Sequence, residues 1–156
     1  MRASLRAGQG GGETSEFVLE LPSNLGVIEA AVAYIVERCK PLGLDDSRVA
    51  LNLRVGVTEA LANAILYGNR KDPSKHVRVN VRLDRSRLSV RVEDQGKGFD
   101  PDAVPDPTLP ANLLRPGGRG IFLIRHLMDE VEFNDRGNVI CLILYSNGSG
   151  SPGQGE

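Results

Sequence analysis

The chain has 156 residues, of which 40% are hydrophobic and 25% are charged, and its 19 basic and 20 acidic residues give a formal net charge of −1. This length and composition are typical of a single globular domain with a hydrophobic core. The balanced charge excludes the strongly basic surface that binds nucleic acid through its phosphates. No uncharged apolar stretch is long enough to span a bilayer, so we expect a cytoplasmic protein with no membrane partner and no direct contact with nucleic acid.

Both ends of the chain are expected to be disordered. Residues 7–15 and 146–156 are rich in glycine and serine, and such segments cannot bury enough surface to become ordered. We therefore predict one folded domain at residues 16–145, with an N-terminal tail at residues 1–15 and a C-terminal tail at residues 146–156.

The domain is predicted to begin with a strand and a helix. Residues 17–21 alternate between apolar and polar types, as in a half-buried strand, and Ser23 is suitably placed to cap a helix. Apolar residues then recur at steps of three and four from Leu25 to Cys39, which predicts a helix with one buried face. Pro41 is expected to end this helix.

A second, longer helix is predicted from about residue 47 to Tyr67, with Gly68 as its C-terminal stop. Its core face is formed by Val49, Leu53, Val57, Leu61 and Ile65. Glu59 and Asn63 interrupt the apolar run, and both side chains leave the same face one turn apart. The pair is either part of a solvated stripe or lies beside space for a ligand, because every second residue from 60 to 64 is alanine.

Residues 77–83 and 88–92 alternate between apolar and polar types around a polar turn, which predicts an antiparallel hairpin. The hairpin leads directly into Asp94 and two nearby glycines, Gly96 and Gly98. The Asp94 carboxylate can accept a hydrogen bond from an amino group such as that of a base, while the glycines allow positive φ and close approach to a ligand. A plain turn between two elements is the alternative interpretation.

Other charged or reactive side chains fit structural roles. Arg78, Arg82 and Arg91 alternate with apolar residues of the hairpin, and they form either a basic patch or the solvated face of an antiparallel sheet. Cys39 and Cys141 are too few and too far apart for a disulfide framework or a zinc site. Because each lies in an apolar stretch, we expect reduced, buried thiols.

Residues 99–116 contain five prolines, which exclude a regular helix or a central strand. A long irregular loop inside a compact domain is often functional, so we expect a lid or binding loop next to the Asp94 turn. It is followed by a helix that starts at Gly117-Gly118-Arg119-Gly120 and then by two strands, near Val131 and at residues 139–144.

The glycine-rich start of this last helix predicts an anion site. Free backbone N–H groups at the positive end of a helix dipole suit an anion, and phosphate is the obvious one. Arg119 either adds a charge-assisted contact there or lies on the surface. The inner face of the helix carries Ile121, Ile124, Leu127 and Met128.

Three motifs thus follow one another: Glu59 to Ala64 on a helix, Asp94 to Gly98 after a strand, and Gly117 to Ile121 at a helix start. They resemble the three nucleotide-binding boxes of the GHKL-type ATP-binding domain (Bergerat fold) of gyrase, the ninety-kilodalton heat-shock chaperone, histidine kinases and the mismatch-repair ATPase. Within this family, residues 16–145 look most like the stand-alone anti-sigma factor serine/threonine protein kinases. The resemblance implies an α+β fold, a two-layer α/β sandwich whose mixed, mostly antiparallel sheet of about five strands is covered on one face by three main helices.

The resemblance also implies a role for each motif in binding ATP together with Mg²⁺. Asn63 would hold Mg²⁺ through its amide oxygen, and Glu59 would orient or deprotonate the hydroxyl of a partner's serine. Asp94 would accept a hydrogen bond from the adenine amino group. The remaining ATP-binding residues would be Gly96 and Gly98 at the base, and Gly118, Arg119 and Gly120 at the phosphates.

The implied activity is that of an ATP-dependent serine kinase that phosphorylates an anti-anti-sigma protein and binds a sigma factor, in a bacterial partner-switching pathway that regulates transcription. Members of this family often form homodimers through the region of the first strand. The alternatives are a non-catalytic module in which ATP orders the loop at residues 99–116, and a slow ATP hydrolase. One position departs from the family. Gly137 is followed by Asn138 where the family commonly has threonine, so Asn138 either replaces a hydroxyl at the adenine or is only a turn residue.

Overall fold

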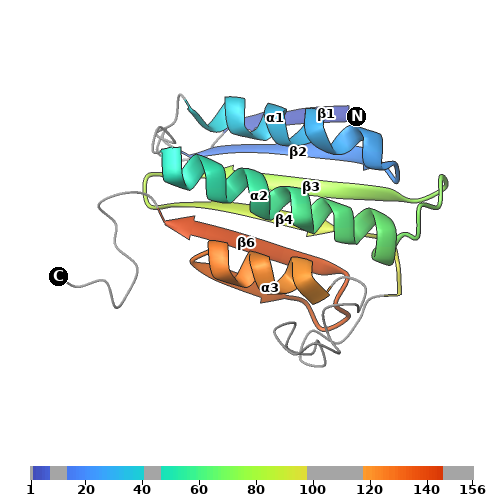
Figure 1. The fold of residues 1–156 in the computed structure, drawn as a ribbon. Coiled ribbons are helices and arrows are strands. Elements are labelled where there is room, and N and C mark those ends of the chain that lie inside the picture. The colour runs from blue at the N-terminus through green and yellow to red at the C-terminus, as the bar shows by residue number, and fades with distance from the viewer. Residues whose placement is uncertain (1, 8–13, 41–46, 98–117, 146–156) are drawn as a thin grey trace.

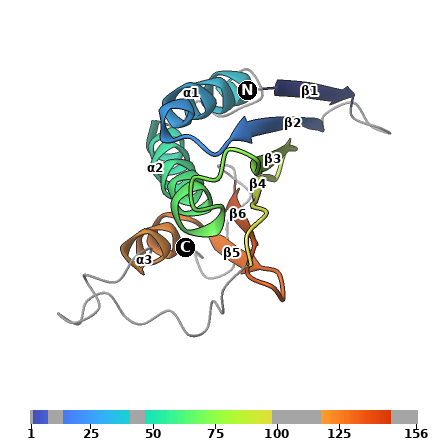
Figure 2. The ribbon, with the colours of Figure 1, turned by 90° about the vertical axis from the view of Figure 1, so that its right-hand side faces the viewer.

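A six-stranded sheet with strand order β1-β2-β3-β4-β6-β5 forms one layer of the molecule, and helices cover one of its faces (Figures 1 and 2). The computed structural model describes residues 2–7, 14–40, 47–97 and 118–145. The strands are β1 (Arg2–Ala7), β2 (Ser15–Pro22), β3 (His76–Leu83), β4 (Arg87–Glu93), β5 (Glu130–Phe133) and β6 (Val139–Tyr145). The helices are α1 (Ile28–Cys39), α2 (Ser47–Asn63) and α3 (Gly118–Leu127), with a 3₁₀ turn, η1 (Leu25–Val27), before α1 and a π-helical turn, η3 (Ala64–Gly68), after α2.

This architecture confirms the predicted two-layer α+β fold, with two differences in the sheet. Every neighbouring pair of described strands is antiparallel, so the sheet is not mixed. The additional strand is β1, whose Arg2 pairs with Glu20 and whose Ala7 pairs with Ser15.

The strand β1 corrects the prediction that residues 1–15 are a disordered tail. The free edge of β2 offers a row of backbone N–H and C=O groups, which pair with another strand largely independently of its side chains. Residues 2–7 contain no glycine, and the glycine-rich part of the segment begins only at Gly8. Residues 8–13 and the predicted tail at 146–156 lie outside the described residues.

Alternation of side chains sets the register of the central strands. Val79 pairs with Val92 and Val81 with Val90, so one face of β3 and β4 is apolar and packs against the helices. The arginines Arg78, Arg82 and Arg91 are exposed on the opposite face, and Arg91 Nη1 lies 3.1 Å from Glu93 Oε1.

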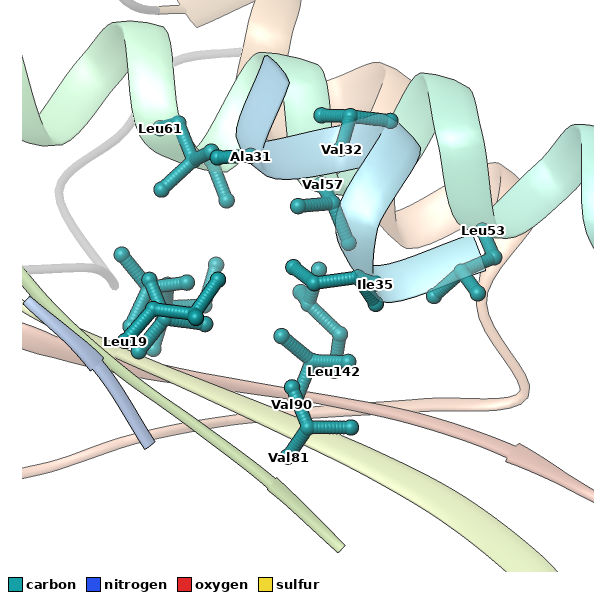
Figure 3. Packing of buried hydrophobic residues seen from close by; sticks show 14 of the residues in the cluster. Leu19, Ala31, Val32, Ile35, Leu53, Val57, Leu61, Val81, Val90 and Leu142 are labelled. Carbon is teal, nitrogen blue, oxygen red and sulfur yellow. The ribbon is translucent and has the colours of Figure 1, made fainter. Parts of the chain in front are cut away.

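The helix α2 is the centre of the helical layer, because it packs against both α1 and α3 and against strands β4 and β6 (Figure 1). In Figure 3, Leu53, Val57 and Leu61 of α2 lie together with residues of α1 above the strand residues Val90 and Leu142. By length and composition alone, the helical segment Ser47–Gly68 is apolar enough to cross a membrane, as core helices of globular proteins also are. Its burial against the sheet gives a sufficient physical reason for that composition.

The entry to the first helix differs from the prediction. Asn24, not Ser23, caps the first turn, since Asn24 Oδ1 accepts a hydrogen bond from the backbone N–H of Gly26 at 2.7 Å. The Ser23 hydroxyl instead donates to the carbonyl oxygen of Lys75 at 2.7 Å. Ser23 therefore ties the end of β2 to the loop before β3.

Candidate functional site

Glu59 and Asn63 lie on the last two turns of α2, and both side chains are partly exposed. Their spacing of four residues places them on one face of the helix, next to each other along its axis. The neighbouring residues Ala60 and Leu61 are buried in the core, so the rotation of α2 about its axis is fixed by packing. The same packing directs Glu59 and Asn63 away from the sheet.

The first turn of α3 lies directly against this pair. A Cβ atom added to Gly120 would lie 3.1 Å from Asn63 Nδ2, 3.4 Å from Asn63 Oδ1 and 3.2 Å from Glu59 Oε2. Any larger side chain at this position would fill the space between the helices. Ile121 and Ile124 anchor α3 in the core. The positive end of a helix dipole is therefore held beside a carboxylate and an amide.

The other predicted residues of this helix start are arranged as follows. Gly118 is the first residue of α3, Arg119 is exposed, and Gly120 is buried. The backbone N–H groups of the first helical turn have no partners within the helix, as the anion-site prediction requires. The predicted lid at residues 99–116, which precedes this turn, lies outside the described residues.

The oxygen atoms at this end of the site suit Mg²⁺. The amide oxygen of Asn63 is a hard ligand, and the absence of a side chain at Gly120 leaves space beside it. Within the described ranges, no three His, Cys, Asp or Glu side chains gather into a metal site of their own. Mg²⁺ usually takes one or two protein ligands and completes its shell with phosphate and water oxygens.

The Asp94 turn begins where β4 ends at Glu93. The backbone N–H of Asp94 donates to the carbonyl oxygen of Asn138 at 2.9 Å, and Asp94 Oδ1 accepts from the backbone N–H of Gly96 at 2.8 Å. Burial raises the pKa of the Asp94 carboxyl above its ordinary value, although the hydrogen bond from Gly96 opposes this shift. A half-buried acceptor of this kind is well suited to a hydrogen-bond donor on a ligand.

Two glycines bring the end of the second helix against this turn. A Cβ on Gly68 would overlap the Asp94 carboxyl group, and a Cβ on Gly96 would overlap the carbonyl oxygen of Gly68. Both positions therefore need glycine for close approach. Gly96 does not use the positive φ that glycine allows, because among described glycines only Gly137 has a positive φ, of 75°. The remaining glycine of the motif, Gly98, lies outside the described residues.

The helix also ends differently from the prediction that Gly68 is its C-terminal stop. Gly68 belongs to the π-helical turn η3, and the left-handed residues follow it at Arg70 (φ 52°) and Lys71 (φ 57°). The N–H of Asn69 donates to Ala64 O at 2.7 Å and the N–H of Lys71 donates to Ile65 O at 2.8 Å, which closes the helix end.

Asn69 is a residue of the site that sequence analysis missed. It is completely buried, and its Oδ1 accepts a hydrogen bond from the backbone N–H of Gln95 at 2.7 Å. The only signal in the sequence is an asparagine directly after a helix, which is usually a capping residue. The sequence left the role of Asn138 open between adenine contact and turn residue. In the structure, its Nδ2 donates a hydrogen bond to the carbonyl oxygen of Asp94 at 3.0 Å.

The structure thus brings the motifs into two clusters along one helical segment. Glu59, Asn63 and Gly120 form the first, and Gly68, Asp94 and Gly96 form the second. At a rise of about 1.5 Å per residue, the segment from Glu59 to Gly68 spans roughly 13 Å. This length suits an extended ligand with an anionic group at one end and a hydrogen-bond donor at the other.

Comparison with known proteins gives a consistent result. Residues 21–144 match the family model of the histidine kinase-like ATPase domain. The chain is 28% identical over 134 residues to the serine-protein kinase RsbW of Bacillus subtilis, with 81% of each chain covered. It is 26% identical over 128 residues to the protein of that name from Oceanobacillus iheyensis, with 78% of each covered, and 33% identical over 111 residues to that from Staphylococcus epidermidis, with 65% of each covered. The matched range contains both clusters.

Proposed function

We propose that this chain, which belongs to the histidine kinase-like ATPase domain family, binds ATP and transfers its γ-phosphoryl group to a serine of a protein partner. The observation that carries the proposal is the position of Gly120, which brings the start of α3 against both Glu59 and Asn63. A phosphate-binding helix start, an oxygen ligand and a carboxylate are the groups that phosphoryl transfer requires.

In this proposal, the adenine lies at the Asp94 turn. The ionised carboxylate of Asp94 accepts a hydrogen bond from the adenine amino group, while Gly68 and Gly96 keep the turn close to the helix end. Gly98 would line the same pocket, as the family resemblance implies. The triphosphate then extends along the segment from Gly68 towards Glu59.

At the phosphate end, the N–H groups of Gly118 and Gly120 bind phosphate oxygens, and exposed Arg119 adds a positive charge. The amide oxygen of Asn63 would hold Mg²⁺, which when bound neutralises charge on the phosphates. The carboxylate of Glu59 orients the serine hydroxyl and accepts its proton. As the serine Oγ bonds to the γ-phosphorus, the bond from that phosphorus to the β–γ bridging oxygen breaks and ADP leaves.

The resemblance to anti-sigma factor kinases supports the choice of partners. We infer that the serine belongs to an anti-anti-sigma protein and that the chain also binds a sigma factor, acting in the cytoplasm. The edge of β1, which among the described strands pairs with β2 alone, is where we place a homodimer contact. The relatives with 26–33% identity carry the name serine-protein kinase, which favours a kinase over a hydrolase or a silent binder.

The test is incubation of the chain with radiolabelled ATP, Mg²⁺ and candidate anti-anti-sigma proteins. Label on a serine of one candidate is expected. Release of free phosphate without any partner would favour a hydrolase instead. ATP binding without transfer or release would favour a nucleotide-sensing module.

A further inference from the structure

The peptide group between Asp94 and Gln95 is held at both of its ends by asparagine side chains. Asn138 Nδ2 donates a hydrogen bond to the carbonyl oxygen of Asp94 at 3.0 Å. Asn69 Oδ1 accepts a hydrogen bond from the backbone N–H of Gln95 at 2.7 Å. One planar peptide unit therefore has both its acceptor and its donor fixed, by one residue that precedes the turn in the sequence and one that follows it.

The Asn69 side chain is part of a buried network that fixes its orientation. Its Nδ2 donates to Ser23 Oγ at 2.9 Å and to the carbonyl oxygen of His76 at 3.0 Å. The Ser23 hydroxyl in turn donates to the carbonyl oxygen of Lys75. A reversed amide would place Nδ2 against the N–H of Gln95, so only one orientation satisfies every group.

The side chain of Gln95, in the Asp94 turn, accepts a further hydrogen bond from the start of β3. The backbone N–H of His76 donates to Gln95 Oε1 at 2.6 Å. Because His76 O also accepts from Asn69, the start of β3, the buried asparagine and the Asp94 turn form one closed set of hydrogen bonds. Such closed sets of hydrogen bonds rigidify the backbone they include.

On the other side of the turn, both atoms of the Asn138 side-chain amide are also hydrogen-bonded. It is 8% exposed, its Oδ1 accepts from Asn134 Nδ2 at 2.7 Å, and its backbone carbonyl accepts from the N–H of Asp94 at 2.9 Å. Asn134 Oδ1 accepts from the N–H of Val139 at 3.0 Å, which fixes the turn before β6. The amide of Asn138 is thus directed to the main chain of Asp94.

We propose that Asn69 and Asn138 form an amide clamp that positions the Asp94 carboxylate for recognition of the base. Fixing the Asp94–Gln95 peptide restricts rotation at Asp94, and the bond from Gly96 N–H to Oδ1 then sets the direction of the side chain. Because the described donor, Gly96 N–H, engages Oδ1, we assign the amino group of the base to Oδ2. This inference rests on the function proposed above, and it gives Asn138 a positioning role in place of direct contact with adenine.

The experiment compares Asn138→Ala with Asn52→Ala by titration calorimetry. Asn52 is a matched control because its Nδ2 also donates to a backbone carbonyl, that of Leu127 at 3.3 Å, but away from the Asp94 turn. Three ligands are titrated in the presence of Mg²⁺: ATP, GTP and inorganic tripolyphosphate. Tripolyphosphate has no base and therefore reports on the phosphate end alone.

For Asn138→Ala we expect the Kd for ATP to rise roughly tenfold, the effect of losing one buried hydrogen bond. The Kd for tripolyphosphate should stay within about twofold of the unmodified value, and the preference for ATP over GTP should fall, since a general loss of structure would weaken all ligands alike. Asn52→Ala should change none of the three. An unchanged Kd for ATP, or an equal loss for tripolyphosphate, would overturn the clamp.

Hydrogen exchange at the Gln95 amide provides a measurement that does not depend on nucleotide or on the folding of a variant. We expect slow exchange in the unmodified, ligand-free chain, because this N–H is hydrogen-bonded to the buried Asn69 side chain. Fast exchange of this amide in the unmodified chain would overturn the clamp. Failure of the unmodified chain to bind ATP would instead overturn the proposed function, and the base-directed role with it.

Discussion

The two ends of the candidate site differ in how their side chains are held. At the Asp94 end, hydrogen bonds from Asn69, Asn138 and Gly96 fix the backbone and one carboxylate oxygen before any ligand is present. At the other end, Glu59 and Asn63 make no side-chain hydrogen bond to another described residue. The base end is therefore preorganised by hydrogen bonds within the protein, whereas the phosphate end is positioned by the packing of α2 and α3.

This difference has a consequence for how each end responds to substitution. Side chains at the phosphate end are expected to act mainly on chemistry and metal-dependent binding, with little effect on the free energy of unfolding, because both are partly exposed and make no hydrogen bond to another described side chain. Groups at the base end are expected to couple ligand affinity to stability. The four substitutions below test this contrast, beginning with the largest expected effect.

Glu59→Gln should lower the rate of transfer to a partner's serine by roughly 10²- to 10⁴-fold, the usual contribution of a general base. The amide keeps the shape and the exposure of the side chain but accepts no proton. Single-turnover transfer of labelled phosphate measures the rate, and calorimetry should give an unchanged Kd for ATP. A transfer rate equal to that of the unmodified chain would remove Glu59 from the mechanism.

Asn63→Ala should weaken ATP binding in the presence of Mg²⁺ by about a hundredfold or more, since it removes the one amide oxygen placed to hold the ion. Titration calorimetry with and without Mg²⁺ separates this loss from any effect on the base end. The thermal unfolding midpoint of the ligand-free variant should remain near that of the unmodified chain. Normal affinity with Mg²⁺ present would contradict the metal assignment.

Glu59 and Asn63 also show which features of the site can be predicted from the periodicity of the sequence. The helical spacing predicted that Glu59 and Asn63 share a face, and the structure adds that Gly120 lies against them. The repeat of apolar residues likewise predicted the buried rows of α2 and the hairpin of β3 and β4. Their roles towards ATP, serine and Mg²⁺ stay predictions until such variants are measured.

Contacts between distant segments could not be predicted in the same way. The overlap that a side chain at Gly68 would make with Asp94, and the bonds from Asn69 and Asn138 to one peptide, depend on tertiary packing that leaves no periodic pattern. Strand β1 was missed for a related reason, since its pairing is driven by the backbone edge of β2. Each of these features was predicted only as a local turn, cap or tail.

Asp94→Asn should show the coupling expected at the base end. Loss of the charged acceptor should weaken ATP binding by roughly 10- to 100-fold, as for other hydrogen bonds to charged groups. The ligand-free variant should nevertheless be more stable at pH 7 than the unmodified chain, because the half-buried carboxylate is ionised at that pH at a desolvation cost. Isothermal denaturant unfolding measures the second effect.

The stability difference between Asp94→Asn and the unmodified chain should depend on pH, in a direction set by the raised pKa of Asp94. Burial raises the folded-state pKa of Asp94 above its unfolded value, and Glu93 adds to the shift while Arg136 and Lys75 oppose it. The folded state thus binds more protons than the unfolded state in the window between the two pKa values. The stability contributed by protonated Asp94 is complete below the unfolded pKa and is lost as the pH rises through the folded pKa. The stability advantage of Asp94→Asn should therefore shrink as the pH falls, and an advantage that grows in acid would contradict the shift.

The smallest effect is expected just after the end of the helical segment, beyond Gly68. Arg70 and Lys71 hold left-handed φ values of 52° and 57°, which cost an L-residue about 1–2 kcal/mol each. Glycine adopts this conformation without that cost but loses more backbone entropy on folding, so Arg70→Gly or Lys71→Gly should raise the free energy of unfolding by about 0.5–1 kcal/mol. Alanine at either position is the matched control, since it removes the charged side chain and retains the backbone cost. If alanine stabilises the chain as much as glycine does, the cause is relief of repulsion between the positive charges of Arg70 and Lys71, and the left-handed backbone is not the cause.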